Sequence, residues 1–386
     1  MTVEVRRVHW KRGVMTEEQK AVARRFLPEI RTALICIRRF LTSYPKDNKN
    51  TAFLTPVWYN VCREKHFAGQ TKCHIKEETN MRILATDGLA KSAVERLTAG
   101  GHEVVEEHFE QSEVGNAIRD FDVVVVRSAT KVKEAEIDAA KGSRLKLIVR
   151  AGVGLDNISV DYARAAGIEV RNTPKAPSNA VAELALGFLL SCARGIAPAT
   201  HDLREQKWDK KGYSKGIELE GKICGIIGYG RIGQCLGRKV QALGMHVLSV
   251  VHCHKPADCE SETMQFVSMQ ELLERSDFIV LCAPPAEKPI LDADAFADMK
   301  DGVSVINVSR AKNLDENALY DALNSGKVRA AGIDVWMTEK AANWYLAGHP
   351  HVTATPHIGS GTAEAQRRIG EEVVEIIEEK SRELNG

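Results

Sequence analysis

The stretch KICGIIGYGRIGQCLGRKVQALGMHVLSVV, residues 222–251, decides how the chain folds. It begins with an apolar run, continues through the glycine turn GYGRIG at residues 228–233, follows a helical pattern, and ends in a second apolar run at residues 246–251. Strand, turn, helix and strand in this order are typical of a βαβ unit. The stretch therefore predicts two neighbouring parallel strands joined by a helix.

The three glycines of this turn have separate physical roles. Gly228 permits the tight turn, Gly230 lets a pyrophosphate approach a backbone without a Cβ, and Gly233 lets the helix pack against the strand. The N–H groups at the start of the helix attract an anion. Because an apolar run precedes the turn and a helical run follows it, a dinucleotide site is favoured over a purely structural turn.

The strand that follows the helix lacks one expected residue. About 20 residues after the first glycine, an acidic side chain normally accepts the ribose hydroxyls of NAD. Here the strand ends in Val250, Val251 and His252. His252, His254 and Lys255 could meet the 2′-phosphate of NADP, or they could form a solvated loop, so the choice between NAD and NADP stays open.

Length and composition limit the class of protein. With 386 residues, 44% hydrophobic and 27% charged, the chain can form two domains with separate cores. We find no apolar run of membrane-spanning length and no signal-peptide segment. Nine cysteines without a repeated spacing indicate a reducing, cytoplasmic location. The cluster formed by His252, Cys253, His254 and Cys259 lacks paired CxxC spacing, so we expect a loop there and no metal.

The first 80 residues differ from the rest in charge. They contain 16 Lys and Arg against 8 Asp and Glu, whereas the remainder contains 37 against 44, so the two parts carry +8 and −7. A mildly acidic main part disfavours nucleic acid as a partner. Residues 1–80 do not continue an α/β pattern, and our hypothesis is that the native protein starts at Met81. The alternative is a basic targeting or docking arm.

From Met81 onward, strands and helices alternate in the way that predicts parallel sheets. We expect a long helix at residues 178–206 and a last helix at residues 363–384 that returns to the first sheet. The predicted fold is α/β, with a substrate domain at residues 81–183 and 363–386 and a dinucleotide-binding domain at residues 184–362. The expected strands are residues 82–86, 103–106, 122–127, 145–150 and 168–171, then 222–228, 246–251, 278–283, 303–309, 330–335 and 352–356.

Three polar residues follow three expected strands of the second domain, namely Arg310, Glu339 and His357. Ligands of an open parallel sheet lie at the carboxyl ends of its strands, so these side chains can converge beside the nucleotide. Arg310 offers a planar fork for a carboxylate, and the imidazole of His357 can exchange a proton near neutral pH. Glu339 could fix the tautomer of that imidazole. The set suits hydride transfer between a nicotinamide and a 2-hydroxy acid.

Several ordered motifs resemble the D-isomer-specific 2-hydroxyacid dehydrogenases, above all the members that oxidise D-3-phosphoglycerate at the entry to serine synthesis. The resemblance implies a flavodoxin-like substrate domain split in sequence, an inserted Rossmann domain, a homodimer, and catalytic roles for the three residues above. Because the sequence ends at Gly386, it also implies a short form without a regulatory domain. The motifs are VVRSATKV (125–132), RAGVGLDNI (150–158), NTPKAPSNAVAE (172–183), LEGKICGIIGYGRIG (219–233), NVSRA (307–311), GIDVWMTE (332–339) and TPHIGSGT (355–362).

The same resemblance assigns further residues. The loop with Gly152, Val153 and Gly154 would bind the substrate carboxylate, with Asn157 supporting that loop. Arg127, Ser128 and Lys131 would contact the rest of the substrate. The expected nucleotide contacts are Gly228, Gly230, Arg231, Ile232, Gly233, Val251, His252, Ala283, Pro284, Val308 and Asp334.

Two positions depart from the family pattern, because Ala311 replaces the usual Gly and Lys340 the usual Pro. The alternatives to phosphoglycerate oxidation are the same chemistry on an unphosphorylated 2-hydroxy acid, or a non-catalytic protein that senses NAD and binds a protein partner.

Overall fold

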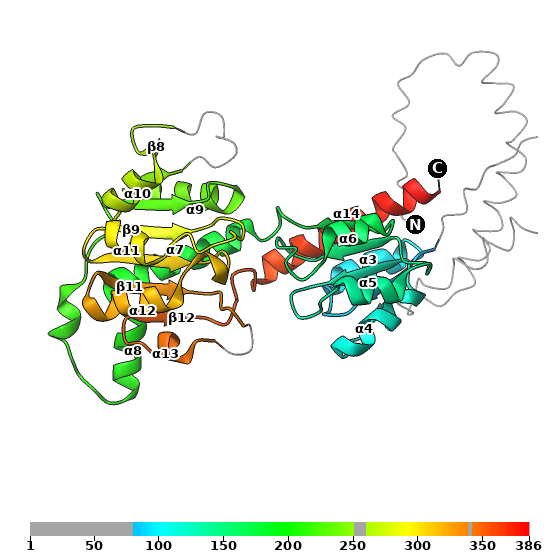
Figure 1. Cartoon of the computed structure of the whole chain (residues 1–386), viewed down its shortest axis with the longest axis horizontal. Helices are drawn as coiled ribbons and strands as arrows, with labels where there is room; N and C mark the ends of the chain where they lie inside the picture. Colours follow the sequence, from blue (N-terminus) through cyan, green and yellow to red (C-terminus); the bar gives the residue numbers. More distant parts are fainter. Residues whose placement is uncertain (1–79, 251–259, 339–341, 386) are drawn as a thin grey trace, which may run out of the picture. The chain divides into compact units, whose positions relative to one another are not determined.

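A computed structural model describes residues 80–250, 260–338 and 342–385, and Figure 1 shows their helices and strands. The hypotheses about the N-terminal extension concern residues 1–80, of which residues 1–79 lie outside the described residues. Residues 77–386 form one compact unit. The unit contains two parallel sheets, one of five strands and one of seven. The predicted α/β class is therefore confirmed.

The five-stranded sheet has the order β2-β1-β3-β4-β5, with every described pair parallel. This is the flavodoxin-like strand order. Its strands are β1 (Arg82–Ala85), β2 (Glu103–Glu106), β3 (Val123–Val126), β4 (Leu147–Arg150) and β5 (Glu169–Asn172). Its helices are α3 (Lys91–Ala99), α4 (Gln111–Ala117), η2 (Ile118–Asp120), α5 (Glu134–Ala140), α6 (Val160–Ala165) and α14 (Ala363–Leu384).

Alternation along the strands fills a core on each face of this sheet. Val123 and Val125 point into one core, whereas Val124 and Val126 point into the other. The first core also contains Val373 and other buried residues of α14. The last helix therefore returns to the first sheet, as the sequence predicts. The domain around this sheet is thus built from segments that precede and follow the second sheet in the sequence.

The seven-stranded sheet has the order β12-β11-β10-β9-β6-β7-β8 and is also parallel. Its strands are β6 (Ile223–Ile227), β7 (His246–Ser249), β8 (Met264–Phe266), β9 (Phe278–Leu281), β10 (Val303–Asn307), β11 (Val328–Ile333) and β12 (Val352–Ala354). Its helices are α7 (Ser178–Arg194), α8 (Ile196–Arg204), η3 (Gly212–Lys215), α9 (Arg231–Ala242), α10 (Met269–Arg275), α11 (Ala293–Asp298), η4 (Ala311–Asn313), α12 (Glu316–Ser325) and α13 (Trp344–Ala347).

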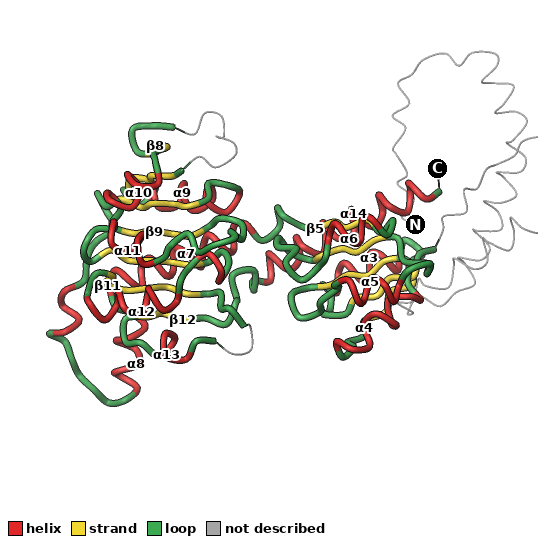
Figure 2. The backbone as a smooth tube through the Cα atoms, in the orientation of Figure 1, coloured by secondary structure: helices red, strands yellow, loops and turns green. Residues whose placement is uncertain are grey.

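This order is the doubly wound dinucleotide-binding order 3-2-1-4-5-6 with one strand added at the end. Helices cover both faces of the sheet (Figure 2): one core contains α7 and α9, and the other contains α10, α11 and α12. The strand order reverses between β6 and β9, so the crevice at their carboxyl ends is the place for a ligand. The glycine turn lies directly after β6.

One predicted element was wrong, and one strand was not predicted. The helix expected at residues 178–206 is broken, because Gly195 adopts a left-handed backbone with φ of 63° and α8 leaves α7 at 68°. The short edge strand β8 was not anticipated. The predicted domain limit between residues 183 and 184 falls inside α7, whose buried residues pack on the second sheet.

No single helix among the described residues has the length and hydropathy of a membrane span, although the bent pair α7 and α8 has them when taken together. Ten of the residues of α7 are buried inside the protein, which is ordinary for the core helix of a compact domain.

Candidate active site

The glycine turn has the open geometry that a nucleotide phosphate needs. Gly228 has φ of 101°, and a Cβ there would lie 2.6 Å from the backbone nitrogen of Ala283. A Cβ at Gly233 would overlap the carbonyl oxygen of Gly228, whereas a Cβ at Gly230 would meet nothing within 4 Å. Gly230 also caps α9 without a side-chain hydrogen bond. The N-terminus of α9 is therefore accessible to an anion.

The other expected nucleotide residues lie around this turn or outside the described part. Ala283 and Pro284 follow β9, next to Gly228. Val308 follows β10 and is buried in the core that contains α7 and α9, so its side chain points inward. Val251 and His252, on which the choice of cofactor depends, lie outside the described residues. So does Glu339, one of the three expected catalytic residues.

The strands that carry the expected catalytic residues are adjacent. β10, β11 and β12 lie next to one another in the sheet, so Arg310 after β10 and His357 after β12 lie at the same edge. Asp334 immediately follows β11, between them. The convergence predicted at the carboxyl ends of these strands is thus supported at the level of topology.

The turn that bears His357 is held by the buried carboxylate of Asp334. One carboxylate oxygen accepts the hydroxyl of Thr355 at 2.6 Å and the backbone N–H of Ile358 at 2.8 Å, and the other accepts the N–H of Gly359 at 2.9 Å. The backbone N–H of His357 donates to the Asp334 carbonyl at 2.8 Å. The sequence predicts a nucleotide contact for Asp334, and these bonds give it a supporting role for the histidine turn.

His357 itself has a backbone conformation that is rare outside glycine. Its φ is 55°, and only one other described non-glycine residue has a positive φ. Such a conformation costs about 1–3 kcal/mol and persists only where surrounding contacts impose it. The bonds from Asp334 supply those contacts. His357 is an exposed residue.

Arg310 is bound to a carboxylate that the sequence analysis did not single out. Its Nε donates to Asp156 at 2.6 Å, and its Nη1 donates to the carbonyl of Ser309 at 2.8 Å. Its Nη2 lies so close to Gly154 that a Cβ there would overlap it. Asp156 and Gly154 belong to the loop after β4, so the guanidinium reaches the loop that is expected to bind the substrate carboxylate.

The loop that carries Arg127 and Lys131 is fixed from two sides. The buried carboxylate of Asp87 accepts the N–H groups of Arg127 at 2.7 Å and Thr130 at 3.2 Å, and the Thr130 hydroxyl at 2.7 Å. The amide of Asn157 donates to the carbonyls of Arg127 at 2.6 Å and Thr130 at 2.7 Å. Arg127 and Ser128 are half-buried, and Lys131 is exposed.

Asn157 lies in the loop after β4, which also contains Gly152, Val153 and Gly154. Its amide joins that loop to the loop of Arg127, and its support for the three carboxylate-binding positions stays a prediction. The carbonyl of Val153 accepts from the amide of Asn172. Gly152, with φ of 147°, lies against the guanidinium of Arg150, where a Cβ would not fit.

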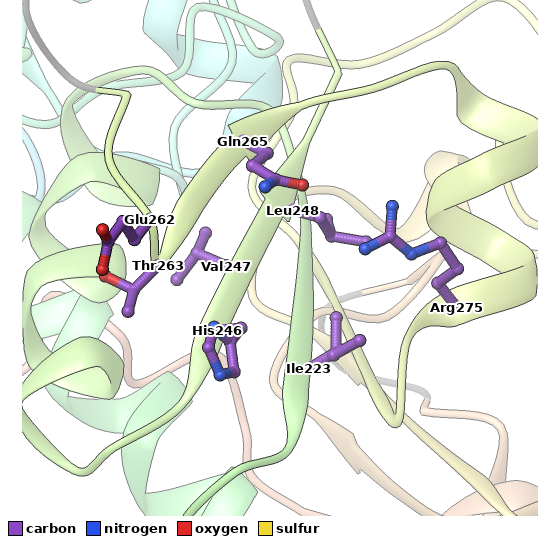
Figure 3. A pocket seen from close by; sticks show the side chains of 8 residues that line it. All are labelled: Ile223, His246, Val247, Leu248, Glu262, Thr263, Gln265 and Arg275. Atoms are coloured by element: carbon purple, nitrogen blue, oxygen red, sulfur yellow. The ribbon is translucent and has the colours of Figure 1, made fainter.

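A separate cavity of about 240 Å³ lies at the amino-terminal ends of strands β6 and β7 in the seven-stranded sheet (Figure 3). It is lined at the start of β6 and β7 by Ile223 and His246, and at the end of α10 by Arg275. The glycine turn follows the carboxyl end of β6, so this cavity is distinct from the nucleotide crevice. Among the residues with described positions, no group of three or more His, Cys, Asp or Glu side chains could hold a metal ion.

The sheet order and the glycine turn define a dinucleotide-binding α/β protein with a second parallel sheet, and comparisons with known proteins identify its family. The model of the D-isomer specific 2-hydroxyacid dehydrogenase NAD-binding domain matches residues 186–359. A hydroxypyruvate reductase of Thermotoga maritima is 46% identical over 303 residues, which are 77% of this chain and 97% of that protein. The chain belongs to the D-isomer specific 2-hydroxyacid dehydrogenases. It is an NAD(P)-dependent oxidoreductase that acts on a CH–OH group.

Other relatives differ in the substrate that they are named for. The D-3-phosphoglycerate dehydrogenase of Methanocaldococcus jannaschii is 41% identical over 300 residues, which are 77% of this chain but 57% of that protein. A solved glyoxylate reductase from Paecilomyes thermophila superposes with a TM-score of 0.71 and 28% identity, covering 78% of this chain and 96% of that one. The family is therefore established, and the particular acid is a matter for proposal.

Proposed function

We propose that the enzyme interconverts D-3-phosphoglycerate and 3-phosphohydroxypyruvate, the entry reaction of serine synthesis. The observation that supports this choice is the loop fixed by Asp87 and Asn157, which presents Arg127 and Lys131. Two cations on a rigid loop suit a phosphate, because charge-assisted bonds to phosphate oxygens are strong. The loop belongs to the same sheet as the loop that touches Arg310.

Each residue of the proposed site has a chemical task. Arg310 and the backbone of Gly152, Val153 and Gly154 bind the substrate carboxylate. His357 takes the hydroxyl proton during oxidation and returns it to the carbonyl oxygen during reduction. Glu339 orients the imidazole. When bound, the nicotinamide supplies or accepts the hydride.

The nucleotide fits the turn between β6 and α9. Gly228, Gly230, Arg231, Ile232 and Gly233 would hold the pyrophosphate at the N-terminus of α9, where a side chain at Gly230 would occupy open space. Ala283, Pro284 and the backbone of Val308 and Asp334 would line the nicotinamide side. Val251 and His252 would face the adenine ribose and decide between NAD and NADP, with NAD as the proposed cofactor.

Reduction of hydroxypyruvate is the second candidate function, and the long match to the hydroxypyruvate reductase favours it. Both functions are tested by following the absorbance of NADH and NADPH with purified protein and each 2-oxo acid. The proposed function requires kcat/KM for 3-phosphohydroxypyruvate to exceed that for hydroxypyruvate. A higher value for hydroxypyruvate would select the second candidate, and no turnover of either would refute both.

Removing the two loop cations should separate the two candidates. The double substitution Arg127→Ala and Lys131→Ala is expected to raise KM for 3-phosphohydroxypyruvate about 10–100-fold, because two charge-assisted bonds are lost, and KM for hydroxypyruvate less than about threefold. Lys91→Ala is the matched control, because Lys91 is exposed on α3 of the same sheet. Equal increases for both substrates would defeat the phosphate assignment.

The enzyme is also proposed to be a homodimer that uses α8. This helix has no buried residue, and its Ile196 and Leu203, seven positions apart on one face, are 53% and 57% exposed. Trp208, which follows it, is 81% exposed. Apolar side chains gathered in this way mark a protein interface, and an isologous contact with a second copy would bury them.

Charge introduced on this surface should separate the subunits. Light scattering is expected to give the mass of a dimer for the unaltered protein and of a monomer for the double substitution Leu203→Glu and Trp208→Glu, because burying two unpaired carboxylates is costly. The matched control is Trp344→Glu, because Trp344 on α13 is also an exposed tryptophan, at 72% exposure. The protein with this substitution should remain a dimer. A dimer that survives the double substitution would place the interface elsewhere.

A further inference from the structure

Asn313 is a polar residue without solvent exposure, three residues after Arg310. Its amide nitrogen lies 3.2 Å from the carbonyl of Ala283, 3.0 Å from that of Pro284 and 3.1 Å from the hydroxyl of Ser309. Its amide oxygen accepts the N–H of Ala286 at 2.9 Å. A buried amide with all of its bonding groups used is costly to replace, so the position requires an explanation.

These bonds join the two segments that frame the expected nicotinamide position. Residues 283–286 follow β9, and Ala283 at their start lies against Gly228 of the glycine turn. Ser309 precedes Arg310 after β10. The backbone of Asn313 adds to the link, because its carbonyl accepts the N–H groups of Ile290 at 2.9 Å and Leu291 at 3.1 Å. A single side chain thus ties the loop after β9 to the loop after β10.

The same network reaches the backbone of Arg310. Asn307 accepts the N–H of Ser309 at 3.0 Å and its hydroxyl at 2.9 Å, and donates to the carbonyl of Arg310 at 3.0 Å. The N–H of Asn313 donates to that carbonyl at 3.1 Å. Asn307, Ser309 and Asn313 therefore hold the peptide of Arg310 from both sides, and the guanidinium adds its own bond from Nη1 to the carbonyl of Ser309.

We propose that Asn313 is a positioning residue that sets Arg310 relative to the loop after β9, and hence the substrate carboxylate relative to the nicotinamide. The proposal rests on the carboxylate-binding role given to Arg310 above. A side chain that only filled space here would stabilise the fold without acting through Arg310. The two roles differ in whether the effect of removing the amide depends on Arg310.

A double-mutant cycle makes that distinction. Oxalate, a planar mimic of a 2-oxo acid, is titrated into the complex with NADH or NADPH, whichever the protein binds, and no turnover is required. Asn313→Ala is expected to weaken oxalate binding about 10–30-fold with Arg310 present, but less than about threefold in the Arg310→Lys background, because residues that act as one unit are not additive. If Asn313→Ala does not fold, Asn313→Ser takes its place in the cycle.

Ser268→Ala is the matched control for stability. Ser268 caps α10 of the same sheet by accepting the N–H of Glu271 at 3.1 Å, and loss of this cap lowers the stability of the fold. Its oxalate affinity should stay within about twofold of the unaltered protein despite a lower melting temperature, as expected for a site that is not coupled to Arg310.

Three results would overturn the proposal: an equal fold loss in both backgrounds, an equal loss from Ser268→Ala, or oxalate affinity that does not change in Arg310→Lys. Absence of activity on both 2-oxo acids would defeat only the proposed substrates, since the binding cycle needs no turnover.

Discussion

His357→Asn is expected to lower kcat about 10²–10⁴-fold in both directions of the reaction, the range typical of a lost general acid–base group. The imidazole is the proposed proton carrier, and an amide cannot replace it. Asn is chosen because it tolerates a left-handed backbone better than most residues, and the φ of His357 is 55°. The turn and the bonds from Asp334 should therefore persist, so that the loss reports on chemistry.

Steady-state rates and the cofactor dissociation constant check this expectation. Affinity for the nucleotide should remain within about threefold, since the imidazole is assigned no part in nucleotide binding and separate sites vary independently. His351→Asn is the matched control: His351 is an exposed histidine at the opposite end of β12. A kcat for His357→Asn within tenfold of the unaltered enzyme would remove His357 from proton transfer.

Local patterns in the sequence predict much of this fold, because strands, helices and the glycine turn are each marked by residues that are close together in the sequence. Short apolar or alternating segments predict eleven of the twelve described strands, and the glycine turn predicts the nucleotide crevice. β8 has three residues, and the polar, exposed Gln265 at its centre leaves no apolar run that would mark a strand. The break between α7 and α8 depends on Gly195, and an isolated glycine in a helical pattern is compatible with continuation or with an end.

The supporting residues of the site could not be found in the same way. Asp156 meets Arg310 across 154 positions of sequence, and Asp87 meets Arg127 across 40. An acidic residue after a strand has the same appearance in sequence whether it is solvated or buried beneath a loop. Asn157 illustrates the point, because the sequence indicates a supporting amide but not which of two loops accepts its bonds. Such partners are selected by the packing of the sheet.

Arg310→Lys is expected to lower kcat/KM for the 2-oxo acid about 10²–10³-fold, which corresponds to about 2.7–4.1 kcal/mol. In the structure each nitrogen of the guanidinium has its own contact: Nε donates to Asp156, Nη1 donates to the carbonyl of Ser309, and Nη2 lies against Gly154. A lysine ammonium is a point charge without the planar fork, so it cannot keep Asp156 and the substrate carboxylate in their places together. Loss of two charge-assisted bonds has the expected size.

Arg144→Lys supplies the matched control, because Arg144 also binds an aspartate through Nε and Nη2, at 2.9 and 2.6 Å from Asp122, at the amino end of the first sheet. The kcat/KM of Arg144→Lys should equal that of the unaltered enzyme.

The substitution Asp156→Asn tests whether the bond between Asp156 and Arg310 assists or opposes binding of the substrate carboxylate. If Asp156 holds the guanidinium for the substrate, this substitution lowers kcat/KM. If the carboxylate of Asp156 competes with that of the substrate, KM falls instead. A kcat/KM for Arg310→Lys within threefold of the unaltered enzyme would contradict both of these roles for Asp156, since the guanidinium of Arg310 would then have no part in binding the acid.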